Sequence, residues 1–134
     1  MFKPAKTIQE YQLIIRKWVV RTMGPSWMES EEERALRFIE EAIEFVQTMS
    51  LDKERIHALV DIKYAQEVGA RNQEAGGVMV TFLAACEHYD LNPMDSLDTE
   101  LVRIHQPQII GKIRDKCREK MSQGIFGKGL ELGH

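Results

Sequence analysis

Residues 30–49 of the chain read SEEERALRFIEEAIEFVQTM. Ser30 followed three residues later by Glu33 is the pattern of a capping box, which opens a helix. The pattern predicts a helix from residue 30 to about residue 49 with one apolar face and one acidic face. The apolar face occupies about half of the helix circumference and consists of Ala35, Leu36, Phe38, Ile39, Ala42, Ile43, Phe45, Val46 and Met49.

Glycine and proline divide the rest of the chain into pieces of helical length. The expected helices cover residues 7–22, about 52–64, 73–89 and about 93–124, and Pro107 and Gly111 are expected to interrupt or kink the last one. Strand patterns are nearly missing. We therefore expect an all-α fold, a bundle of four to five helices, in a single helical domain over residues 1–134. About 125–134 is glycine-rich and is expected to form a flexible tail.

Composition and charge exclude several classes of protein. Of the 134 residues, 43% are hydrophobic and 29% are charged, which is typical of a globular domain. The formal net charge of -3 argues against a strongly basic nucleic-acid-binding surface. No apolar run approaches the ~20 residues of a membrane span. Cys86 and Cys117 are far apart and no secretory signal precedes them, so we expect reduced thiols and a cytoplasmic location.

Three carboxylates gather on the polar half of the helix predicted for residues 30–49. Glu40, Glu41 and Glu44 share this face, and Glu41 and Glu44 lie one turn apart, where two side chains can reach the same ion. Like charges at this spacing repel each other unless a cation or solvent offsets the repulsion. The face is therefore either a cation site or a solvated acidic surface.

A fourth carboxylate, Glu74, precedes a run that is apolar on all sides. Residues 78–86 are apolar apart from Thr81, so we expect this helix to be buried, with Glu74 close to other elements. A cation held jointly with Glu41 and Glu44 would compensate its charge. Alternatively, Glu74 interacts with the N-terminus of its own helix. Oxygen-only ligands favour a hard cation such as Mg²⁺, especially with a phosphate substrate.

Two motifs are similar to those of a known family. Glu40-Glu41-Ala42-Ile43-Glu44 resembles the EExxE motif of the MazG-like all-α nucleoside triphosphate pyrophosphohydrolases, and residues 73–80, QEAGGVMV, resemble its second motif, ExxD. The resemblance covers about residues 29–120. Gly77 stands where the family has its aspartate, so one of four metal-site carboxylates is missing. A branch of the family also carries Gly-Gly here, and Asp61 is a possible substitute ligand.

The resemblance implies a fold of this family's type and a reaction. The family hydrolyses a nucleoside or deoxynucleoside triphosphate to the monophosphate and pyrophosphate. It implies that Glu41, Glu44 and Glu74 bind Mg²⁺, or Mn²⁺, and that Glu40 orients or deprotonates the attacking water. It also implies a homodimer or homotetramer. Because Gly77 replaces the aspartate, a catalytically impaired relative that binds a nucleotide or a metal is the alternative.

Further side chains are candidates for substrate contacts. Trp27 can stack on a base or seal the edge of a core, and Arg103 and Lys112 can contact phosphates. Residues 112–120 carry five cations with Asp115 and Glu119 between them, which is also typical of a solvated helix. A helical interaction module that binds nucleic acid through this segment is a further hypothesis, although nucleic acid is not the expected partner.

Overall fold

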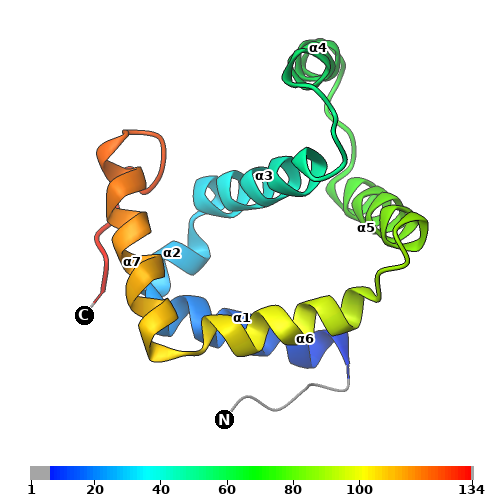
Figure 1. The fold of residues 1–134 in the computed structure, drawn as a ribbon. Helices are drawn as coiled ribbons and strands as arrows, with labels where there is room; N and C mark the ends of the chain where they lie inside the picture. Colours follow the sequence, from blue (N-terminus) through cyan, green and yellow to red (C-terminus); the bar gives the residue numbers. More distant parts are fainter. Residues whose placement is uncertain (1–6, 134) are drawn as a thin grey trace. The chain divides into compact units, whose positions relative to one another are not determined.

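The computed structural model describes residues 7–133, and this part of the chain contains seven α-helices and no strand (Figure 1). The all-α prediction is confirmed. Pro25 begins a short helix that the sequence pattern did not predict. The interruption expected at Pro107 is found, because Pro107 begins a separate helix, whereas that helix continues through Gly111 without a break. The helices are α1 (Ile8–Thr22), α2 (Pro25–Glu29), α3 (Glu31–Gln47), α4 (Lys53–Tyr64), α5 (Arg71–His88), α6 (Pro93–Ile104) and α7 (Pro107–Ser122).

Short polar side chains begin four of these helices. Thr7, Ser30, Asp52 and Asn92 each accept a hydrogen bond from the backbone N–H three residues later, at 2.8–3.2 Å. Each bond satisfies one of the N–H groups that lack a partner inside the helix. The predicted starts near residues 7, 30, 52 and 92 are confirmed.

The chain forms two compact units. Unit 1 contains the residues up to Glu41 and from Asp98 onward, and unit 2 contains Ala42–Leu97. Helices α3 and α6 each contribute residues to both units. Within residues 7–133, no helix combines the length and apolar character that a membrane span requires.

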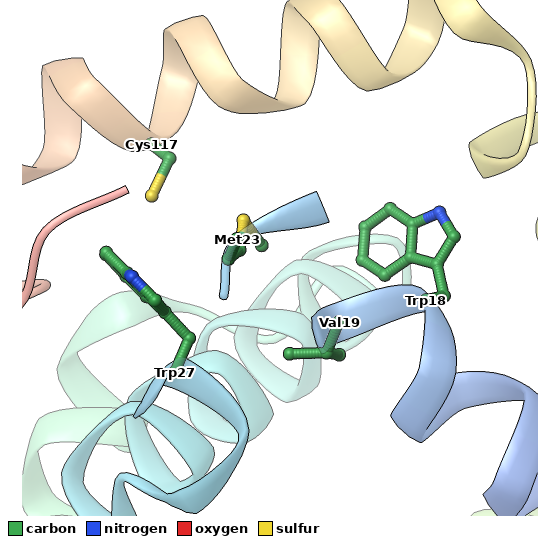
Figure 2. Packing of buried hydrophobic residues seen from close by; sticks show 5 residues of the cluster. All are labelled: Trp18, Val19, Met23, Trp27 and Cys117. Carbon is green, nitrogen blue, oxygen red and sulfur yellow. The ribbon is translucent and has the colours of Figure 1, made fainter. Parts of the chain in front are cut away.

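The core of unit 1 lies between α1, α2 and α7. Trp18 and Val19 of α1, Met23, Trp27 of α2 and Cys117 of α7 form a buried cluster (Figure 2). Both indoles also find polar partners, because Trp18 Nε1 donates to Ile104 O at 2.8 Å and Trp27 Nε1 donates to Glu131 O at 2.9 Å. Truncating one such buried aromatic side chain costs about 3–5 kcal/mol. The two tryptophans therefore dominate the packing of unit 1.

Residues 124–133, here called the C-terminal segment, lie against this core. We expected a flexible tail at about 125–134; His134 lies outside the described residues. Leu130 and Leu132 pack on the buried cluster, and Gly133 N donates to Met23 O at 2.7 Å. The guanidinium of Arg114 donates to Thr22 O and to Gly133 O, both at 2.5 Å. Unit 1 therefore includes the C-terminal segment as part of its packing.

Unit 2 buries much less of its apolar surface. Cys86 is buried, and the rings of Phe45 and Phe82 meet edge to face with centroids 5.7 Å apart. The expected burial of residues 78–86 is not found in the single chain, because unit 2 offers too few apolar neighbours to cover α5. The exposed large apolar side chains of α4 and α5 are Leu59, Val60, Ile62, Tyr64, Val78, Met79, Val80, Phe82 and Leu83.

Candidate functional site

The acidic motif lies on α3, where the helical spacing fixes the relation of its three carboxylates. Glu40 and Glu41 belong to unit 1, and Glu44, one turn later on the same helix, belongs to unit 2. Glu41 and Glu44 are exposed, whereas Glu40 is half-buried. Side chains three or four residues apart on a helix are neighbours. The polar face of α3 thus presents two exposed carboxylates beside one that is partly enclosed.

Arg103 of α6 lies within electrostatic range of this motif. Its side chain forms an ion pair with Glu100 at 2.6 Å on the same helix. The pKa of Arg103 is raised, chiefly by that hydrogen bond and the charge of Glu100, with a further contribution from the charge of Glu41. The charge of one carboxylate of the motif therefore acts on one of the cations proposed for phosphate binding, which is itself paired with Glu100.

A second cation contacts the motif directly. Lys120 Nζ of α7 lies 2.6 Å from Glu40 Oε1. The two side chains are 26% and 24% exposed, in contrast to 52% and 53% for Arg103 and Glu100. Sequence reasoning placed Lys120 only in a basic segment. The signal that could have singled it out is its spacing, since it lies three residues after Cys117 and therefore borders the buried face of α7.

The start of α3 carries a buried charge that the sequence did not reveal. Glu33 is 1% exposed, and its Oε2 accepts the backbone N–H of Gly127 at 2.7 Å. Arg37 Nη2 lies 3.3 Å from the other oxygen, Oε1. Ser30 caps the helix as predicted, by accepting the N–H of Glu33. The side chain of Glu33, which a capping box would direct to the backbone of Ser30, accepts the N–H of Gly127 in the C-terminal segment.

Glu74 lies in the first turn of α5, in unit 2. A Cβ added at Gly69 would lie 2.8 Å from Glu74 Oε1, so the carboxylate lies over the backbone that precedes the helix. This position suits an interaction with the N-terminus of α5. Within residues 7–133, no three His, Cys, Asp or Glu side chains gather closely enough to hold a metal ion, and Asp61 of α4 is exposed.

The glycine pair after Glu74 has open space where a side chain would begin. A Cβ at Gly76 or Gly77 would meet no atom within 4 Å among the described residues. Among residues 7–133, no atom would contact a Cβ at either glycine. Room for a larger side chain exists at the position where the resembling family has its aspartate.

The remaining candidates lie in different surroundings. Trp27 has 0% exposure and packs against the C-terminal segment, so it cannot stack on a base in this structure. Lys112 is exposed on α7. Of the basic segment 112–120, Arg114 bonds backbone carbonyls and Arg118 pairs with Asp115 at 2.9 Å. With Lys120 bound to Glu40, three of the five cations are engaged within the chain, which leaves less charge for nucleic acid.

Comparison with known proteins finds no relative: no family model, no curated protein and no solved structure matches the chain.

Proposed function

We propose that the protein is a Mg²⁺-dependent nucleoside triphosphate pyrophosphohydrolase that releases pyrophosphate from an NTP or dNTP. The observation that carries this proposal is the contact between the acidic motif of α3 and a cation of α7. Glu40 contacts Lys120 at 2.6 Å, and Glu41 acts on the charge of Arg103. A held carboxylate that can take a proton from water, with carboxylates that can hold a divalent cation and a cation, Arg103, that can hold phosphate, are the parts that hydrolysis of a phosphoanhydride requires.

The donor set is compatible with the proposed ion. Glu41, Glu44 and Glu74 offer only carboxylate oxygens, which Mg²⁺ and Mn²⁺ prefer. When bound, the ion would neutralise phosphate charge and lower the pKa of a coordinated water. Glu41 and Glu44 would hold it from neighbouring turns of α3, and the resemblance assigns the third carboxylate to Glu74.

The protein side chains would supply the remaining chemistry. Glu40 would accept a hydrogen bond from the attacking water and take its proton. Arg103 would bind phosphate oxygens through its guanidinium, whose donors suit a planar, forked contact. Because Gly77 stands where the family that the chain resembles has an aspartate, the set is one carboxylate short, and we expect a high Mg²⁺ requirement.

Pyrophosphate release from a panel of NTPs and dNTPs, with Mg²⁺, Mn²⁺ or a chelator, tests the proposal. Metal-dependent release that Glu41→Gln lowers by on the order of 10²-fold would support it, in line with removal of a group that acts in catalysis. Glu32→Gln is the matched control, because Glu32 is exposed on the same helix outside the motif. No release by folded wild-type protein would contradict it.

The position of Gly77 favours one second candidate, a relative that binds a nucleotide or metal without turnover. Calorimetry with a non-hydrolysable triphosphate and Mg²⁺, run beside the turnover assay, separates the two. Binding without pyrophosphate release would support the second candidate. Neither binding nor release would contradict both.

We also propose that the chain assembles with itself, as a homodimer or homotetramer. Unit 2 exposes large apolar side chains on both of its middle helices, among them Val80 at 69% and Ile62 at 55%. A large exposed apolar surface is typical of a site that contacts another protein. Light scattering tests the proposal: Val80→Glu should lower the mass, Glu87→Lys should not, and a wild-type mass of 15.5 kDa would contradict it.

A further inference from the structure

The contact between Glu40 and Lys120 differs from the other ion pairs of α6 and α7. Arg103–Glu100 and Arg118–Asp115 join neighbouring turns of one helix and have side chains at least half exposed. Lys120 instead reaches a residue eighty positions earlier, and both partners are about three-quarters buried. Exposed pairs of the first kind contribute little to stability or order. A largely buried ion pair between two helices restricts the orientation of both side chains.

We infer that Lys120 is a positioning residue, which holds the carboxylate of Glu40 in the orientation that the proposed reaction needs. The inference rests on the proposed function. Lys120 engages one carboxylate oxygen, Oε1, so Oε2 is left to accept a hydrogen bond from a water. A carboxylate with one oxygen fixed rotates less freely, and reacting groups displaced by about 1 Å can lose on the order of 10²-fold in rate.

Lys120 is itself held in place by the C-terminal segment. Its ammonium lies over the ring of Phe126, with Nζ 5.2 Å from the ring centroid. The guanidinium of Arg37 lies over the same ring, at 4.9 Å. Cation–ring contacts of this kind are attractive when the cation is partly desolvated. The ring of Phe126 therefore contacts two cations of unit 1.

The position of Phe126 is fixed in turn by the next residue. Gly127 donates its N–H to the buried Glu33 at 2.7 Å and has a positive φ of 70°. A Cβ at Gly127 would lie 2.7 Å from Met121 Cγ and 2.8 Å from Trp27 Cη2, so the backbone fits closely against the core. The chain of contacts runs from the core through Phe126 and Lys120 to Glu40.

Steady-state kinetics of pyrophosphate release by the full chain tests the inference. Lys120→Met should lower kcat about 10- to 100-fold and leave KM within about twofold, because the substrate contacts stay while Glu40 loses its orientation. Lys120→Arg should restore kcat to within about fivefold of wild type, since it keeps a donor at this position. Lys116→Met is the matched control, an exposed lysine one turn earlier on α7.

Each other result has a definite meaning. A higher KM with unchanged kcat would assign Lys120 to substrate phosphate, and a higher kcat would make the pair inhibitory; both outcomes overturn the inference. Equal kinetics of Lys120→Met and wild type also overturn it and leave the proposed function intact. No turnover by wild type overturns both. If Lys120→Met fails to fold, as judged by tryptophan fluorescence, Phe126→Leu replaces it. Phe126→Leu should lower kcat about threefold, and unchanged kcat would contradict the inference.

Discussion

Removing the buried carboxylate of Glu33 should destabilise unit 1 more than any other single acidic substitution in α3. Glu33→Ala leaves the buried N–H of Gly127 without its acceptor, at a cost of about 1–3 kcal/mol. It also removes the partner of Arg37, and breaking a buried ion pair costs about 3–5 kcal/mol. Arg37 keeps 21% exposure and can regain water, so we expect about 3–4 kcal/mol in total. That loss corresponds to a Tm lower by about 10 °C.

Urea unfolding followed by tryptophan fluorescence measures this loss. Trp27 is fully buried beside the C-terminal segment, so its emission should shift to the red when Gly127 is released. Glu33→Gln keeps an oxygen for the N–H and should lose only about 1–2 kcal/mol. Glu32→Ala, exposed in the same turn, should stay within about 0.5 kcal/mol of wild type. Equal losses for Glu33→Ala and Glu32→Ala would refute the reasoning.

Three further predictions follow from local geometry. Gly127→Ala should destabilise the protein by about 2–4 kcal/mol, because the alanine would combine an unfavourable positive φ with contacts under 3 Å. Gly129 has a positive φ of 73° and open space, so Gly129→Ala should cost only about 1–2 kcal/mol. Equal Tm shifts for the two variants would contradict the role of the close contacts. The pKa of Glu100 is lowered, chiefly by the hydrogen bond from Arg103, so its contribution is present above the unfolded pKa of glutamate and is lost as the pH falls through the folded pKa. The pair is half exposed and worth at most about 1 kcal/mol. The Tm values of wild type and Glu100→Gln should therefore converge as the pH falls from neutral through the folded pKa of Glu100, and a constant gap would contradict this. Gly77→Asp should lower the Mg²⁺ concentration for half-maximal pyrophosphate release by roughly tenfold, since the side chain has room and adds a carboxylate ligand. An equal effect of Gly76→Asp would contradict a specific ligand at position 77, because it would show that only the added local charge matters.

The starts of the helices were predictable because they depend on neighbouring residues. Ser30, Asp52 and Asn92 cap helices where the sequence placed them. The separation of α6 from α7 at Pro107 was foreseen as an interruption or a kink, and sequence alone could not decide between them. The short helix after Gly24 was missed, because five residues hold too little periodicity to be seen.

The candidate site was predictable only where its residues share one helix. Glu40, Glu41 and Glu44 follow from the spacing within α3. The contact of Glu40 with Lys120 joins residues eighty positions apart, and no local pattern announces it. Glu33 was read as a capping residue, since its sequence neighbourhood fits that role, while its burial depends on where Gly127 lies. Charge pairs made by tertiary packing are thus the part that sequence reasoning missed.

The location of the two tryptophans has a spectroscopic consequence. Trp18 and Trp27 both lie in the core of unit 1, and unit 2, residues 42–97, contains no tryptophan. Tryptophan fluorescence therefore reports on unit 1, whereas far-ultraviolet circular dichroism also detects the helices of unit 2. Coincident melting curves from the two signals would mean that the units unfold as one cooperative block. Curves that separate would mean that the two units melt at different temperatures, with the tryptophan signal reporting that of unit 1.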